Sequence, residues 1–444
     1  MTKRHGYALL AALLAVTLVV SAAIYLGVTG ADDTGDASGA NPRAPRNSAA
    51  PASAGTWVGT WSASPAGAEP GTEAHGLAGR SVRNVVHTSV GGDGARVTLS
   101  NLYGSRPLTV THASLAVAAG AGSPAAAADT LRRLTFRGET SVVIPPGRQV
   151  VSDAARLRVP HDADLLVTTY SPTPSGPVTY HPHARQISYV ADGDRTEDAT
   201  GAAYHEQSPY WRYVSAVDVL SSDTDGTVVV IGDSITDGIT STMGANRRWT
   251  DVLADRLRDE AGAPRYSVVN QGISGNRVLS DGRPGRFADA PAANPSGLSR
   301  FGRDVLGRSG AKAVVIALGI NDILRNPRQT DAQRILDGLR ELTRQAHTRG
   351  LRVVGATLMP FGGHRGYTPA LEAVRQSVNA EIRSGRVFDD YVDFDKALRD
   401  PYDPRRLLRR YDSGDSLHPS DAGFRRMGET FDLGALKGSG AAEL

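Results

Sequence analysis

Cysteine is absent from this 444-residue sequence. Disulfide bridges, metal sites built on thiolates and a cysteine nucleophile are therefore excluded. A chain of this length can bury enough apolar area to be stable without disulfides, so the absence of cysteine does not argue against export.

Lysine is nearly as scarce, because it occurs only at positions 3, 312, 396 and 437. Arginine supplies the rest of the 49 basic residues, and 46 acidic residues leave a formal net charge of only +3. No long Lys/Arg run occurs in the part that is expected to fold, so nucleic acid is not expected as a partner. With 40% hydrophobic and 21% charged residues, the chain has the composition of a globular protein, and its length indicates more than one domain.

The N-terminus carries a targeting signal. Lys3 and Arg4 precede an apolar run from Ala8 to about Val28, which is the pattern of a secretory signal. The run is also long enough to cross a bilayer as a helix. A cleaved signal peptide is favoured over an uncleaved anchor, and both remain open. In either case the rest of the chain is expected to be exported.

Composition and periodicity divide the chain into five segments. Residues 31–55 are small, polar and proline-rich, as a flexible linker should be. The expected segments are a signal peptide or membrane anchor (1–30), the linker (31–55), a β-sandwich accessory domain (56–222), an α/β domain (223–434) and a disordered tail (435–444).

The region 56–222 shows short alternating segments separated by turn residues, for example Arg96–Ser100 and Asp164–Tyr170. Gly91–Gly94 lies between two such segments, as a hairpin turn would. These patterns predict an antiparallel β-sandwich. Trp57 and Trp61 could stack on a sugar, but aromatic residues in strands more often belong to the core.

From residue 227 the pattern changes to alternating strands and helices. A short continuous apolar run at Thr227–Ile231 is typical of a strand buried on both faces. Five strands that alternate with helices predict a parallel sheet with right-handed crossovers. The remaining expected strands contain Val268–Val269, Ala313–Leu318, Leu351–Leu358 and Val387–Phe394, and the expected helices contain Trp249–Leu257, Ile335–Ala346 and Leu371–Ile382.

Ligands of open α/β sheets bind beyond the carboxyl ends of the strands. Ser234 follows the first expected strand, and His418 with Asp415 follows the fifth at a distance. A serine hydroxyl becomes a nucleophile when a base takes its proton, and a carboxylate can orient that base. Taken singly, Ser234 could merely cap a helix and His418 could be a surface histidine.

Gly275 and Asn321 follow the second and third expected strands. A glycine N–H and an asparagine side-chain N–H could stabilise the oxyanion of acyl transfer, although each alone is an ordinary turn residue. His364, in a glycine-rich loop, could line the same site. His181 and His183 form an isolated His-x-His, so no metal site is expected there.

These four segments together resemble the GDSL/SGNH hydrolase family, which is named for a Ser, a Gly, an Asn and a His from four sequence blocks. Ser234 in Gly-Asp-Ser-Ile, Gly275 in Gly-Ile-Ser-Gly-Asn, Asn321 in Gly-Ile-Asn-Asp and His418 in Asp-Ser-Leu-His-Pro match the four blocks, with Asp415 as third member of the triad. The match covers about residues 227–432. It implies a flavodoxin-like three-layer α/β/α fold.

The upstream region is also similar to a β domain found on some exported actinobacterial members of this family. The similarity rests on Trp57–Ser64 and Asn84–Ser89. The resemblance implies a carboxylesterase, acetyl-esterase or lipase-like hydrolase that needs no cofactor or metal. Its partner would be a small-molecule or polysaccharide acyl ester.

Two other functions remain open. The same acyl-enzyme could transfer its acyl group to an alcohol other than water, which a product analysis with an added sugar acceptor would show. Alternatively, the chain could be a catalytically inactive polysaccharide-binding surface protein. The complete set of Ser, Gly, Asn, Asp and His residues argues against inactivity, and labelling of Ser234 by a fluorophosphonate would decide it. Acyl chain length, alcohol group and oligomeric state are not predicted.

Overall fold

The computed structural model describes residues 55–282 and 293–438, which all belong to one compact unit. The expected signal or anchor and nearly all of the expected linker lie outside the described residues, as do residues 439–444. Among the described helices, none is both long and apolar enough to cross a membrane.

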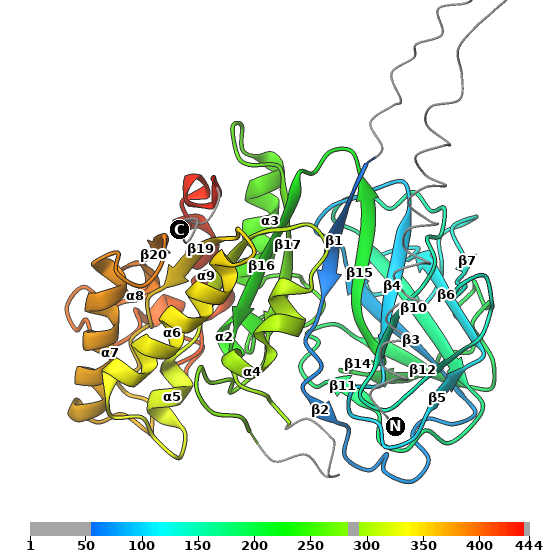
Figure 1. Cartoon of the computed structure of the whole chain (residues 1–444), viewed down its shortest axis with the longest axis horizontal. Coiled ribbons are helices and arrows are strands. Elements are labelled where there is room, and N and C mark those ends of the chain that lie inside the picture. The colour runs from blue at the N-terminus through cyan, green and yellow to red at the C-terminus, as the bar shows by residue number, and fades with distance from the viewer. Residues whose placement is uncertain (1–54, 283–292, 439–444) are drawn as a thin grey trace, which may run out of the picture. The chain divides into compact units, whose positions relative to one another are not determined.

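The region before residue 222 consists of antiparallel β-sheets, as predicted (Figure 1). A four-stranded sheet has the order β1 (Thr56–Ser62), β15 (Val214–Ser221), β4 (Ala95–Ser100) and β9 (Gln149–Val151). A six-stranded sheet has the order β13 (Glu206–Ser208), β12 (Ser188–Asp192), β3 (Arg80–His87), β10 (Asp164–Ser171), β6 (His112–Val117) and β7 (Arg132–Arg133). A three-stranded sheet has the order β14 (Trp211–Arg212), β11 (Thr179–His181) and β2 (Gly67–Ala68). A two-stranded sheet consists of β5 (Leu108–Val110) and β8 (Val142–Ile144).

The two larger sheets share a hydrophobic core. Val97 and Val217 of the first sheet and Val86 and Val167 of the second are fully buried in the same cluster. Side chains alternate between the two faces of a strand, so each sheet turns one apolar face toward the other. Trp61, only 5% exposed, belongs to this core, so its ring is not free to stack on a sugar.

The predicted hairpin at Gly91–Gly94 is wrong. The preceding strand, β3, pairs with β10 and β12, whereas the following strand, β4, pairs with β15 and β9. The glycine segment therefore carries the chain from one sheet to the other. A turn between two alternating segments shows that the chain reverses, but it does not show which strands pair.

The second region contains the predicted parallel sheet of five strands, with helices against it (Figure 1). The order is β17 (Tyr266–Gly272), β16 (Gly226–Gly232), β18 (Ala311–Ala317), β19 (Arg352–Ala356) and β20 (Asp390–Val392), all parallel. In chain order this is 2-1-3-4-5, the flavodoxin-like arrangement.

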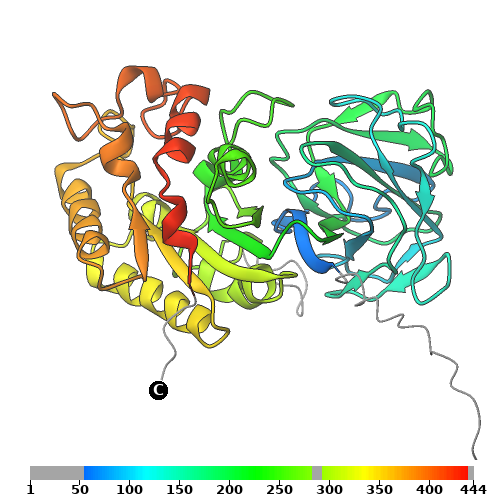
Figure 2. The same cartoon turned by 90° about the horizontal axis from the view of Figure 1, so that it is seen from above.

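Helices cover both faces of this sheet (Figure 2). Alternate residues of β16 point to opposite faces, so Val228 packs in one core cluster and Val229 in the other. The first cluster includes residues of α3 (Trp249–Asp259) and α9 (Asp421–Thr430), and the second includes residues of α6 (Ala332–His347) and α7 (Pro369–Arg383). Shorter elements are α2 (Ser234–Asp237), α4 (Gly297–Phe301), α5 (Ile320–Leu324), α8 (Phe394–Leu398), a π-helix (Gly302–Leu306) and two 3₁₀ turns (Arg409–Tyr411, Leu433–Leu436).

The ordered chain extends beyond the predicted start of the disordered tail at residue 435. Leu433–Leu436 forms a 3₁₀ turn, and Leu436 is fully buried against the core that includes α3 and α9. The small residues of this segment looked like a fraying end, but Leu433 and Ala435 are also buried in the same cluster, and the apolar area that the three residues remove from water stabilises the turn.

Candidate active site

The residues singled out from the sequence lie in loops at the carboxyl edge of the parallel sheet. Ser234 begins α2 directly after β16, and Gly275 lies three residues after the end of β17. Asn321 lies in α5, which follows β18. Asp415 and His418 lie in the loop before α9. Because neighbouring parallel strands end at the same edge, these loops are brought together.

Ser234, His418 and Asp415 form a continuous hydrogen-bonded chain. His418 Nε2 is 2.8 Å from Ser234 Oγ, and His418 Nδ1 is 2.6 Å from Asp415 Oδ2. The carboxylate can only accept, so Nδ1 carries the hydrogen and Nε2 is left to accept from the serine hydroxyl. This is the geometry in which an imidazole removes the proton of a nucleophile.

Asp415 is fixed by the backbone as well as by the imidazole. Its Oδ1 accepts from the N–H groups of Leu417 (2.9 Å) and His418 (2.8 Å). Burial alone would raise the pKa of Asp415, but hydrogen bonds and charge from His418 outweigh it and hold the pKa below its usual value. The carboxylate therefore stays ionised and keeps the imidazole oriented.

Gly275 has the backbone conformation that favours glycine, with φ of +77°. Within the described part of the chain, its N–H has no hydrogen-bond acceptor, so it is available to a substrate oxygen. The guanidinium group of Arg325 lies directly over Gly275. A Cβ at this position would be 2.6 Å from Arg325 Cζ, so a side chain would clash.

Asn321 is held from both ends of its amide. Its Oδ1 accepts from Arg325 Nε (3.0 Å), and its Nδ2 donates to Asp233 Oδ2 (3.2 Å). Asp233 also caps α2 by accepting from Ile235 N (3.0 Å), and burial raises its pKa to about 6. One Nδ2 hydrogen of Asn321 remains for a ligand. Arg325 thus contacts both Asn321 and Gly275.

The structure therefore brings together all five residues that the sequence analysis selected, while their chemical roles remain predictions. His364 lies near Asp415 and His418, whose charges act on it, and burial lowers the pKa of His364. Arg325 was missed, because one exposed arginine among many carries no signal in a single sequence. In the structure Arg325 is the residue that ends α5, four positions after Asn321.

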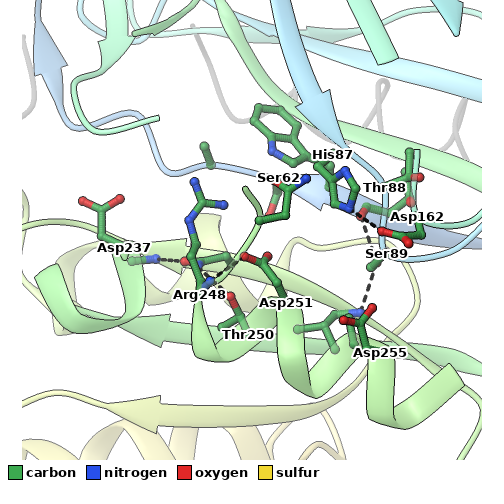
Figure 3. Close-up of a pocket in the computed structure, with 18 of the residues that line it drawn as sticks. Ser62, His87, Thr88, Ser89, Asp162, Asp237, Arg248, Thr250, Asp251 and Asp255 are labelled. Atoms are coloured by element: carbon green, nitrogen blue, oxygen red, sulfur yellow. Dashed lines mark hydrogen bonds and ion pairs between the residues drawn. The ribbon is translucent and has the colours of Figure 1, made fainter. Parts of the chain in front are cut away.

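A separate cavity lies between the β-sheet region and α3 (Figure 3). Its lining residues include His87, Asp162, Asp237, Arg248, Asp251 and Asp255. His87 bridges Asp164 (2.9 Å) and Asp162 (2.8 Å). Burial would lower the pKa of His87, but the hydrogen bond to Asp164 and the charges of Asp251, Asp164 and Asp162 outweigh it and raise the pKa. Neither Ser234 nor His418 lines this cavity, so it is distinct from the cluster described above.

The sequence profile of the GDSL-like lipase/acylhydrolase family matches residues 230–426. None of the curated proteins matches the chain. Solved structures similar to it include a GDSL-like lipase from Bacteroides thetaiotaomicron (21% identity, 46% of this chain and 85% of that one, TM-score 0.33). Another is the α/β hydrolase LAE5 from the Lake Arreo metagenome (22% identity, 48% of this chain and 98% of that one, TM-score 0.35). A third is the acetylxylan esterase Axe2 from Geobacillus stearothermophilus (20% identity, 47% of this chain and 96% of that one, TM-score 0.35).

We expect Gly275→Ala to lower the kcat for p-nitrophenyl acetate about tenfold or more. The new Cβ would strain the backbone by roughly 1–2 kcal/mol and push Arg325 away from Asn321. Arg325→Ala in the same chain should restore part of the activity, since it removes the clash but not the strain. Arg325→Ala alone is the reference, and Gly275→Ala with wild-type kcat would contradict this account.

Proposed function

We propose that the C-terminal part of this chain, which over residues 230–426 belongs to the GDSL-like lipase/acylhydrolase family, is a serine carboxylesterase with Ser234 as nucleophile. Membership of the family makes it an esterase-like hydrolase. The assignment of roles is supported by one observation above all, the 2.8 Å contact between Ser234 Oγ and His418 Nε2.

In the proposed acylation step, His418 takes the proton of Ser234 while Oγ attacks the carbonyl carbon of the ester. The bond to the leaving alcohol breaks, and His418 returns the proton to the alcohol oxygen. Asp415 remains ionised and stabilises the imidazolium that forms. In deacylation a water molecule takes the place of the alcohol, and the same proton transfers release the acid.

The negative charge that develops on the carbonyl oxygen would be stabilised by the N–H groups of Ser234 and Gly275 and by Asn321 Nδ2. Fixed donors of this kind lower the barrier because they need no reorganisation during the reaction. Loss of one such donor should cost about 3 kcal/mol, or roughly 10²–10³ in rate. Every step uses side chains and backbone of the chain itself.

We further propose that the acyl group is short. The side chains near Gly275 and His418 include the charged guanidinium group of Arg325 and the imidazole of His364, which make this part of the site polar. A long acyl chain needs an apolar groove that removes it from water. Acetyl esters of small molecules or polysaccharides fit this environment.

The N-terminal apolar run supports the proposal that the enzyme works outside the cytoplasm. Lys3 and Arg4 before the run would stay on the cytoplasmic side, and the remaining chain would be carried across the membrane. Cleavage would release the enzyme, and an uncleaved run would tether it to the membrane surface.

Ser234→Ala should abolish hydrolysis of p-nitrophenyl acetate without lowering the Tm, because the hydroxyl is needed for chemistry and not for packing. Asp415→Asn should reduce kcat by about 10²–10⁴, since the imidazole loses its orienting carboxylate. A fluorophosphonate should label the wild-type chain at Ser234. Folded Ser234→Ala protein that retains hydrolysis would refute the assignment.

A series of p-nitrophenyl esters tests the proposed acyl length. We expect kcat/KM to be highest for acetate to butyrate and at least about tenfold lower for octanoate and palmitate, because a long acyl chain would lie against the polar groups of Arg325 and His364. Release of acetate from acetylated xylan, measured in parallel, extends the test to a polysaccharide. A maximum at octanoate or longer would overturn the short-acyl proposal.

Export is tested by expressing the full chain in a bacterial host and locating it by cell fractionation. We expect the protein in the medium or on the outer side of the membrane, and N-terminal sequencing to show whether the first 30 residues are removed. A chain that lacks residues 3–28 serves as the control and should stay in the cytoplasm. Full-length soluble protein in the cytoplasm of the first strain would contradict export.

A further inference from the structure

Both neighbours of Gly275 are held in place by buried polar side chains. Ser274 donates to Asp237 Oδ2 through its backbone N–H (2.9 Å) and its hydroxyl (2.6 Å). Asn276, on the other side, accepts from Arg300 through its Oδ1. The direction of the Gly275 N–H therefore depends on Asp237 and Arg300.

Asp237 is in turn bound by a histidine from the β-sheet region. His181, at the end of β11, contacts Asp237 Oδ1 through Nε2 (2.9 Å) and the backbone oxygen of Ser64 through Nδ1 (2.8 Å). Both partners accept hydrogen bonds, so both ring nitrogens carry a hydrogen. The two side chains are each only 3% exposed. Burial alone would raise the pKa of Asp237, but His181 and Ser274 outweigh it and the pKa is lowered.

Arg300, which holds Asn276, is also bound by a residue of the β-sheet region. Arg300 Nη1 donates to Ser64 Oγ (2.9 Å), while Nε and Nη2 donate to Asn276 Oδ1 at 3.1 and 2.9 Å. Arg300 and Ser64 are almost completely buried. Ser64 thus binds both His181 and Arg300: its carbonyl oxygen accepts from His181, and its hydroxyl accepts from Arg300.

We propose that His181 is a positioning residue for ester hydrolysis, which sets the Gly275 N–H through Asp237 and Ser274. The β-sheet region would then be part of the catalytic unit rather than a separate substrate-binding module. This inference rests on the proposed function, since it assumes that Gly275 N–H binds the developing oxyanion. His181 and Asp237 also line the cavity shown in Figure 3, where Asp237 lies at one end.

The physical reason is that oxyanion donors act only within a few tenths of an ångström of the correct place. A loop freed from Asp237 would still bind substrate, but the Gly275 N–H would spend less time aimed at the oxyanion. A displacement of about 1 Å can cost up to 10² in rate. The expected signature is therefore a fall in kcat with little change in KM.

The test compares His181→Gln, Ser274→Ala and their double variant in the full chain. His181→Gln removes the charged partner of Asp237, and Ser274→Ala leaves that pair intact while it removes the hydroxyl contact to the loop. We expect each to lower kcat for p-nitrophenyl acetate about tenfold to 100-fold, with KM within about threefold of wild type. The double variant should be little worse than the more affected single variant, because both act through Asp237.

His183→Gln is the matched control. This histidine lies two residues along the chain and is exposed, and its charge acts on Asp237 as that of His181 does. Among the described residues, however, no hydrogen bond joins it to Asp237 or to the Gly275 loop, so His183→Gln separates the loss of a nearby charge from the loss of the hydrogen bond. Its kcat should stay within about twofold of wild type. Binding of a boronic acid, which imitates the tetrahedral intermediate, should weaken in His181→Gln and Ser274→Ala as kcat falls, a change that reduced stability alone would not produce.

Ser274→Ala and His181→Gln proteins that fold and keep the kcat of the His183→Gln control would overturn the inference. If His181→Gln does not fold, Ser274→Ala decides alone, because its substitution leaves no buried charge unpaired. A wild-type chain that hydrolyses no ester and takes no fluorophosphonate would instead refute the proposed function. The two failures are thus distinguished by the activity of the unmodified protein.

Discussion

The common direction of the five central strands is the constraint on which the rest of the structure depends. Because β16, β17 and β18 lie side by side and point the same way, the loops that leave them meet at one edge. The common strand direction therefore brings Ser234, Gly275 and Asn321 to the same edge of the sheet. The loop before α9 places His418 at the same edge, within hydrogen-bonding distance of Ser234.

Much of the α/β region could be predicted, because local patterns decide it. A continuous apolar run at Thr227–Ile231 requires a strand covered on both faces, and β16 is buried along its length. The repeat of apolar residues in Ile335–Ala346 likewise corresponds to α6. The candidate catalytic residues could be selected because small, polar and titratable residues follow the expected strands in the sequence. The structure brings these residues together, and their roles await the kinetic tests.

What could not be predicted depends on contacts between distant residues. The pairing of β3 and β4 with different partners is decided by which sheets pack together, and the glycine turn between them is compatible with either arrangement. His181 looked like half of an isolated His-x-His, because its partner Asp237 lies in another part of the chain. Arg325 and the buried Leu436 were missed for the same reason, since their importance comes from what they touch.

The position of Ser64 has a practical consequence for work on the hydrolase alone. A shortened protein that begins near residue 223 would match the family profile, yet it would lose the buried hydrogen bonds that join Arg300 to Ser64, Gln271 to Ser62 and Asp237 to His181. The truncation would also expose the surface of β17 against which β1 packs in the intact chain, so such a fragment would be prone to aggregation. Protein engineering of this enzyme should treat residues 55–438 as the smallest unit to express.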